Sequence, residues 1–198
     1  MMIVIYDKKE KNFEKNGLAV LNEAVECKII EKLNNEYELV ISYPLYSKKA
    51  QHIQPFNIIK ADGQLFRIYN TDKDSKAGLV TAYARHIFYD LLNYIIQDRR
   101  AENKTCKEAL DIIFDELKLS EVYTAESDIE EIATQYLVKK NGVEAVFLLV
   151  NEWQGELVRD NFKIGIYKNK GKDRGVHIRY GKNILGISEK INCDNVAT

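Results

Sequence analysis

The chain has 198 residues, enough for one large or two small domains, and its 45% hydrophobic and 30% charged composition is typical of a soluble globular protein. No apolar run approaches the roughly 20 residues that span a bilayer, and the N-terminus lacks the zones of a signal peptide. The net charge of −1 gives no overall preference for nucleic acid. We therefore expect a protein made in a cytoplasm, without a membrane partner.

Three cysteines, Cys27, Cys106 and Cys193, are far apart in the sequence and odd in number. This pattern favours neither a disulfide framework nor a zinc site, because both need cysteines at paired spacings.

Residues 1–85 are predicted to form about six short strands. The first covers residues 2–6. Residues 25–29 and 37–43 alternate apolar and polar side chains on the two sides of Asn34-Asn35, whose residues tolerate the positive φ of a tight turn. The alternation predicts a hairpin, and Pro44 ends its second strand because proline cannot donate to a ladder.

A second hairpin is predicted over residues 56–69, with Asp62-Gly63 at its turn. Asp-Gly between apolar runs favours the type I′ turn, which matches the twist of the two strands. One more strand follows at residues 79–85. Meander spacing of these strands suggests a small barrel or a strongly curled sheet.

Helical periodicity begins at His86. Residues 86–94 predict a short helix that closes one end of the barrel. Thr105 and Glu108 have capping-box spacing, so an amphipathic helix should follow them. Residues 133–139 are predicted to form a strand, with Tyr136 and Val138 facing one way. Asn141, with Glu144 three residues later, should cap a further helix over residues 143–153.

That helix leads into a long predicted β-hairpin over residues 153–183. Its first arm is residues 156–167, where Phe162, Ile164 and Ile166 alternate with other residues as in a half-buried strand. Residues 168–175 carry turn chemistry, and Val176, Ile178 and Tyr180 alternate on the return.

Catalytic motifs are absent from the sequence, and no catalytic, cofactor-binding or metal residue is assigned. His86 and Asp90 have the i,i+4 spacing of two metal ligands, but the favoured interpretation is a helix-end imidazole near a carboxylate. Cys106 lies at a predicted helix N-terminus, which can activate a thiol, yet no histidine is near it in sequence. Asp128, Glu130 and Glu131 belong to the acidic run 121–131, which we interpret as a solvated face.

A basic cluster occupies the long hairpin. Asp160 and Asp173 are its only acidic residues between positions 159 and 182. We favour solvated hairpin charge, followed by contact with an acidic surface such as residues 121–131 of a neighbouring subunit, followed by nucleic acid. Its cations are Arg159, Lys163, Lys168, Lys170, Lys172, Arg174, Arg179 and Lys182.

The same hairpin carries a resemblance to a known family. Its patches read W-x-G-E-L-x-R-D-N-F, then D-R-G-V, then I-R-Y-G-K-N, and earlier blocks include E-Y-E-L-V-I-S-Y-P, N-I-I-K-A-D-G-Q-L-F-R-I-Y, A-R-H-I-F-Y-D-L-L and N-K-T-C-K-E-A-L. Together they resemble the N-terminal tail-hub region of the phage minor structural proteins called prophage tail endopeptidases or tail-associated lysins. Members of that family are similar in fold to baseplate-hub proteins.

The resemblance implies an α+β fold in three parts. Residues 1–100 would be a mostly antiparallel, barrel-like ring domain with a closing helix, and residues 101–184 an α+β domain with two or three helices and the long hairpin. Residues 185–198 would begin a second, truncated barrel.

The implied function is structural and non-enzymatic, without a cofactor, in the tail of a phage or prophage virion. The full-length protein would form a homotrimeric ring and attach to the tail tube or distal tail protein. Two alternatives stay open: a tail-associated cell-wall endopeptidase or hydrolase, and a nucleic-acid contact through residues 159–182, although nucleic acid is the less favoured partner.

Overall fold

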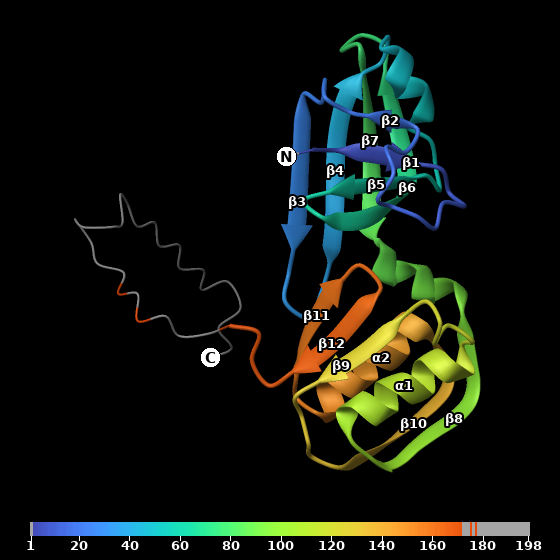
Figure 1. Cartoon of the computed structure of the whole chain (residues 1–198), viewed down its shortest axis with the longest axis vertical. Helices are drawn as coiled ribbons and strands as arrows, with labels where there is room; N and C mark the ends of the chain where they lie inside the picture. Colours follow the sequence, from blue (N-terminus) through green and yellow to red (C-terminus); the bar gives the residue numbers. More distant parts are fainter. Residues whose placement is uncertain (1, 172–174, 176, 178–198) are drawn as a thin grey trace, which may run out of the picture.

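The computed structural model describes residues 2–171, 175 and 177. Two units lie one above the other along its long axis (Figure 1). The upper unit holds the strands β1 to β7, and the lower unit holds β8 to β12 with both α-helices. Mostly antiparallel strands combined with helices confirm the α+β class.

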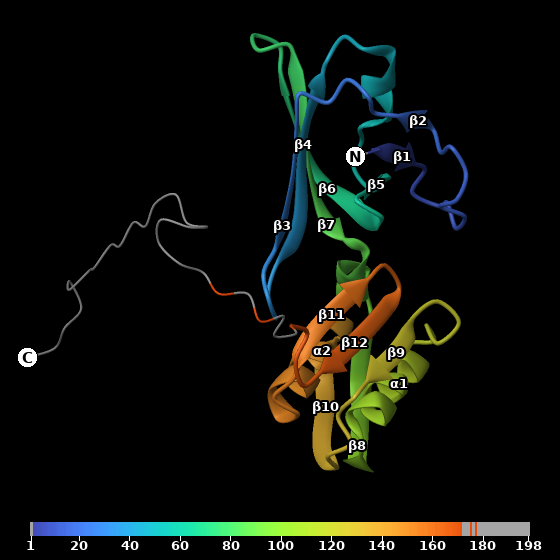
Figure 2. The same cartoon turned by 60° about the vertical axis from the view of Figure 1, so that its left-hand side comes forward.

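The upper unit is one seven-stranded antiparallel sheet. Its spatial order is β2-β1-β5-β6-β7-β4-β3. Besides the pairs of consecutive strands, β1 therefore also pairs with β5, and β4 with β7. Figure 2 shows the sheet curling, with β3, β4 and β7 upright and β1, β5 and β6 crossing them. The expected strongly curled sheet is therefore confirmed. The strands are β1 (Val4–Tyr6), β2 (Ala19–Val20), β3 (Glu26–Glu31), β4 (Tyr37–Pro44), β5 (Ile58–Ala61), β6 (Gln64–Asp74) and β7 (Leu79–His86).

Both predicted tight turns are present. Asn34 has φ of 51° between β3 and β4. Asp62 and Gly63 have φ of 51° and 77° between β5 and β6, which is the left-handed pair that a type I′ turn requires. These turns set the register of the two hairpins whose tips point toward the lower unit.

The core of the upper unit lies on the inner face of the curled sheet. Along β4, every second side chain is buried, in agreement with the predicted alternation. The 3-10 helix η1 (Lys48–His52) follows β4 and adds Ala50 to this core. The buried residues of β4 are Tyr37, Leu39, Ile41 and Tyr43.

The 3-10 helix η2 (Ile87–Asn93) joins the two units and leads into β8 (Ile95–Lys104). The expected helix over residues 86–94 is therefore present as a 3-10 helix. Strand β8 was not anticipated, and its buried residues Ile96 and Ala101 belong to the core of the lower unit. A domain boundary at residue 100 would fall inside this strand.

The helices of the lower unit are α1 (Cys106–Glu116) and α2 (Gly142–Glu152). Both begin with a complete capping box, formed by Thr105 with Glu108 and by Asn141 with Glu144, as the sequence predicted. Strand β10 (Ala133–Asn141) pairs with β8 in a separate two-stranded sheet.

The long hairpin expected over residues 153–183 is wrong in its first arm. This arm is itself a short hairpin, made by β11 (Glu156–Asp160) and β12 (Lys163–Tyr167). The chain reverses at Asn161, which has φ of 52°, a conformation that asparagine tolerates. The expected return strand at residues 176–180 falls mostly outside the described residues, as does the expected second barrel from residue 185.

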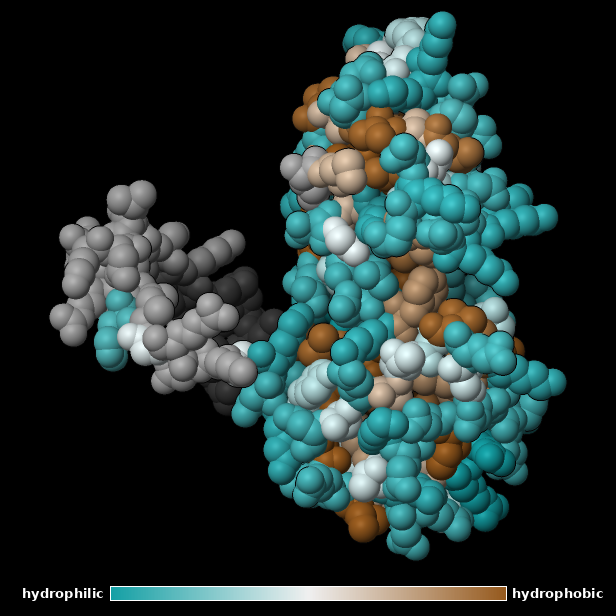
Figure 3. Space-filling view, viewed as in Figure 1, coloured by the Kyte–Doolittle hydropathy of each residue, from teal (hydrophilic) through white to brown (hydrophobic). Residues whose placement is uncertain are grey.

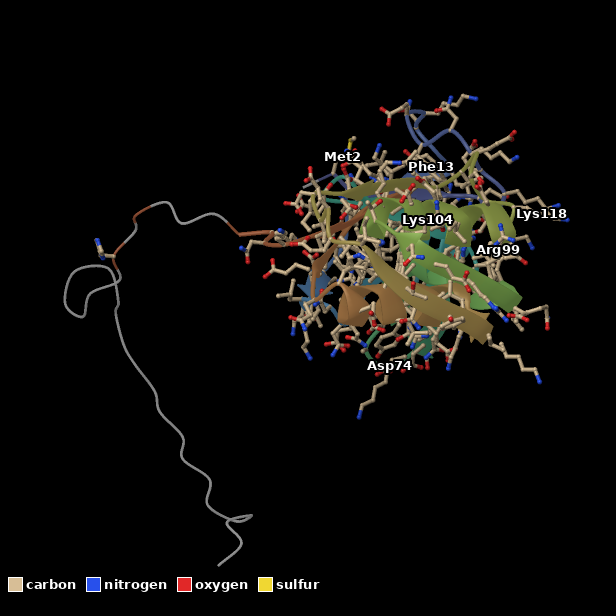
Figure 4. All side chains as sticks on the ribbon, turned by 90° about the horizontal axis from the view of Figure 1, so that it is seen from below. Met2, Phe13, Asp74, Arg99, Lys104 and Lys118 are labelled. Atoms are coloured by element: carbon tan, nitrogen blue, oxygen red, sulfur yellow. The ribbon has the colours of Figure 1, made fainter. Side chains whose placement is uncertain are left out.

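A further strand, β9 (Thr124–Ser127), lies inside the acidic run 121–131 and pairs with β12 in parallel. The order β11-β12-β9 completes the third sheet. Viewed from the lower end, the side chains of Arg99 and Lys104 lie on β8 (Figure 4). Among the described helices, none has the length and apolar character that crossing a bilayer demands.

Candidate functional site

His86 and Asp90, the pair with metal-ligand spacing, belong to two separate interactions. His86 is fully buried at the end of β7, where its Nδ1 accepts a hydrogen bond from the backbone N–H of Phe88 at 3.2 Å. Its Nε2 lies 3.1 Å from the Gln64 side-chain oxygen, so this nitrogen is the donor. Burial, together with the nearby charge of Arg159, lowers the pKa of His86 to about 3. The ring is a neutral structural group.

The carboxylate of Asp90 is held by Arg67. The Arg67 Nε donates to Asp90 Oδ1 at 2.7 Å, and Nη2 donates to Oδ2 at 2.6 Å, in a bidentate ion pair. Among the described residues, no group of three histidine, cysteine or acidic side chains has a geometry that could hold a metal ion.

Cys106 lies at the first position of α1 and is buried. Burial raises the pKa of its thiol to about 11, which outweighs the lowering that a helix N-terminus can give. The thiol is therefore protonated at neutral pH and is a poor nucleophile.

The basic cluster and the acidic run, which the sequence suggested could meet between subunits, meet within this chain. Lys163 pairs with Glu126 at 2.6 Å and Lys168 pairs with Glu131 at 2.7 Å. Lys170 reaches across to Glu31 of the upper unit at 2.8 Å. These pairs neutralise three of the cations that a nucleic acid would need. The remaining cations of the cluster beyond Lys170, namely Lys172, Arg174, Arg179 and Lys182, lie outside the described residues.

The motif W-x-G-E-L-x-R-D-N-F forms the joint between the two units. Its tryptophan, Trp153, is buried at the end of α2, and the indole N–H donates to the Glu131 carbonyl at 2.8 Å. A Cβ on Gly155 would come within 2.3 Å of Ile166 and 2.9 Å of Ile129, so only glycine fits. The motif therefore first packs the β11–β12 hairpin against its own unit.

The same hairpin then binds the tip of the β3–β4 hairpin. The Asn34 side chain donates to the Gly155 carbonyl at 3.0 Å and accepts from the Leu157 backbone N–H at 2.7 Å. A single asparagine thus satisfies backbone groups on both sides of Glu156. This contact is specific to the left-handed conformation at Asn34, which aims its side chain at β11.

A second exchange joins the tip of the β11–β12 hairpin to the β5–β6 hairpin. The Leu65 backbone N–H donates to the Asn161 side-chain oxygen at 2.9 Å, and the Asn161 backbone N–H donates to the Gln64 side-chain oxygen at 3.0 Å. The Asn161 amide also donates to the Gly63 carbonyl at 3.0 Å. The Gln64 amide donates to Asp160 at 2.9 Å.

Phe162 supplies the apolar side of the joint. Its ring lies edge-on to Tyr123 of the lower unit, with 5.5 Å between centroids, and 6.2 Å from Phe13 of the upper unit. Phe162 also packs against Ile87 and its neighbours in a small cluster between the units. In the space-filling view, apolar residues gather at mid-height, where the two units meet (Figure 3).

Sequence reasoning missed the role of Arg159, which it placed in the solvated basic cluster. The Arg159 side chain is fully buried between the units, and burial lowers the pKa of its guanidinium. The available signal was its place two residues after Leu157, on the inward-facing side of a strand.

Two surfaces of the upper unit are open for contacts. Strand β3 pairs only with β4, so six residues of strand edge are unpaired within the described part of the chain. Val25, which precedes it, is 66% exposed. A second surface, flanking the Arg67–Asp90 pair, carries the exposed side chains of Phe56, Tyr69, Leu92 and Tyr94.

Comparison with known proteins finds a match for the upper unit. Residues 3–86 match the family model of the prophage endopeptidase tail N-terminal domain. The upper unit is similar to such a domain. The resemblance seen in the sequence motifs is confirmed, and the matched residues coincide with the seven-stranded sheet.

Solved tail proteins share the fold of most of this chain. The prophage tail protein gp18 from Listeria monocytogenes EGD-e has a TM-score of 0.73 at 17% identity, covering 93% of this chain and 56% of that one. The 43 kDa tail protein of prophage MuSo2 from Shewanella oneidensis has a TM-score of 0.62 at 15% identity, covering 93% and 58%. The tail protein from Neisseria meningitidis MC58 has a TM-score of 0.55 at 7% identity, covering 83% and 49%.

This chain thus spans a little over half the length of the first of these tail proteins. A search of curated protein sequences gave no match.

Proposed function

We propose that the chain is the N-terminal part of a structural tail-tip or baseplate-hub protein of a phage or prophage, and that it does no catalysis itself. The match of the whole upper sheet to a prophage tail domain carries this proposal. The buried, neutral His86 and the buried thiol of Cys106 support a structural role, because the candidate reactive groups serve the fold. No contact of the described residues favours the hydrolase alternative.

The upper unit would form a ring with sister copies through the open edge of its sheet. An unpaired strand edge can add a strand from another chain by main-chain hydrogen bonds. Strand β3 offers such an edge, with the exposed Val25 at its start. The full-length protein would form a homotrimer, located in the virion tail and bound to the tail tube or distal tail protein.

The test is the mass of the full-length protein in solution. We expect a trimer, and a stable monomer at tens of micromolar would contradict the ring. Val25→Lys should weaken the assembly, because a charge at the edge opposes strand addition. The matched control is Val122→Lys, at an exposed valine of the lower unit away from β3. Equal masses for the two variants would exclude the β3 edge and leave the ring to other surfaces.

A further inference from the structure

Arg159 projects from β11 into the space between the two units. Its Nη1 donates to the Asn35 carbonyl and, at 3.2 Å, to the Tyr89 hydroxyl. Its Nη2 donates to the Lys32 carbonyl at 3.1 Å. A guanidinium of the lower unit is therefore bound by two carbonyls of one turn in the upper unit.

Those two carbonyls are held together by the turn itself. The Asn35 backbone N–H donates to the Lys32 carbonyl, so both oxygens have fixed positions at the tip of the β3–β4 hairpin. The Tyr89 hydroxyl donates to the Asn35 carbonyl at 2.9 Å and closes the network from the η2 side. The arrangement matches the planar fork of donors that arginine presents.

Aromatic rings confine the guanidinium from two further sides. Its carbon lies 5.1 Å from the ring centroid of Tyr37 on β4 and 5.9 Å from that of Phe88 on η2. The nearest carboxylate, that of Glu31, is 4.0 Å away. Most of the compensation for burying this charge therefore comes from carbonyl dipoles and ring faces, which act only at short range and in one geometry.

A buried charge of this kind selects an arrangement more than it adds stability. The Nε of Arg159 has no hydrogen-bond partner among the described residues, so the site is not optimised for binding energy. Apolar contacts such as that of Phe162 tolerate a small slide or rotation of the units. The guanidinium does not, because any such movement takes it away from both turn carbonyls while it remains surrounded by protein.

We infer that Arg159 is a positioning residue that fixes the angle between the two units. Asn34 supports the same angle, since its two hydrogen bonds fix the same turn against β11. This role of Arg159 does not depend on a place in a tail. In an assembly, this fixed angle would mean that a contact made by one unit also orients the other unit.

The experiment compares residual dipolar couplings of backbone amides in the two units. In the wild-type chain, both units should fit one alignment tensor. Arg159→Met keeps a long, unbranched side chain without the charge, and we expect the two units to require different tensors. Asn34→Gly tests the same angle from the upper unit, because glycine retains the positive φ of the turn but lacks the side chain that binds β11. It should give the same loss of common alignment.

Lys163→Met is the matched control. It removes a cation from the same hairpin, but one that pairs with Glu126 inside the lower unit, so a single tensor should persist. A common tensor with the wild-type orientation in Arg159→Met and Asn34→Gly would overturn the inference. So would two tensors in the wild type. Loss of native chemical shifts in the lower unit of Arg159→Met would also overturn it, because Arg159 would then hold that unit's own core.

Discussion

The two units of this chain are held together in different ways. In the upper unit, all seven strands are antiparallel and one sheet curls around its core. In the lower unit, two small sheets and two helices share a core, and β9 joins β12 in parallel from a point almost forty residues earlier. The comparison teaches that antiparallel pairing alone organises the upper unit, including pairing between distant strands such as β4 and β7, whereas the lower unit also needs a parallel pair and two helices.

Large-to-small substitutions in each core give the strongest way to break this comparison. Phe66 is fully buried in the upper core, and Phe114 is almost fully buried in the lower core. Truncating a buried phenylalanine to alanine costs about 3–5 kcal/mol. We expect Phe66→Ala to expose amides of the upper unit first and Phe114→Ala to expose those of the lower unit, as measured by native-state hydrogen exchange.

Each variant serves as the control of the other. Equal loss of protection in both units, in both variants, would contradict separate cores and would show that the chain unfolds as one block.

Lowering the pH should reduce the stability of the upper unit through His86, which lies next to the joint. Its pKa is about 3 in the folded chain and 6.5 as the ordinary value, so between these pH values only the unfolded chain binds the proton. The free energy of unfolding therefore falls as the pH drops, by ~1.4 kcal/mol per pH unit over most of this window. Arg159, which contributes to the lowered pKa, stays charged throughout.

His86→Gln isolates this effect, because glutamine does not titrate. Urea unfolding between pH 7 and pH 4 should give a shallower pH dependence in the variant than in the wild type. Parallel curves for the variant and the wild type would show that His86 binds its proton over the same pH range in the folded and the unfolded chain.

The sequence predicted what depends on neighbouring residues. The Asp62-Gly63 turn and both capping boxes follow from side chains within a few positions, and all are present. The reversal at Asn161 was missed because Asn161-Phe162 is not a common two-residue turn pair, although the apolar positions change there from odd to even numbers. Arg159 and Asn35 are separated by 124 residues, so the spacing from Leu157 marks the inward face of the strand but not the turn that binds the guanidinium.

Two glycines allow the cost of overpacking to be compared with the cost of backbone strain in a turn. Gly155 has no room for a Cβ beside Ile166 and Ile129, so Gly155→Ala should cost about 1–3 kcal/mol by overpacking. Gly63 has open space around it, and Gly63→Ala adds only the strain of φ at 77°, about 1 kcal/mol. Chemical denaturation of both variants measures the difference. A larger loss in Gly63→Ala would show that backbone strain, rather than packing, limits the joint.

The smallest losses of stability are expected from substitutions at the N-termini of the two helices. Thr105→Ala and Asn141→Ala each remove one capping box, at a cost of about 1 kcal/mol. Asn141 is also the last residue of β10 and pairs with Ile95, so its loss should disturb both helix and sheet.

Lys107→Ala is the control, since it removes only an exposed i,i+4 pair with Asp111, worth about 0.3–0.5 kcal/mol. Thermal unfolding should therefore rank Asn141→Ala below Thr105→Ala and both below Lys107→Ala in stability. If Thr105→Ala matched Lys107→Ala, the first turn of α1 would be held by burial of Cys106 and its neighbours and not by its cap.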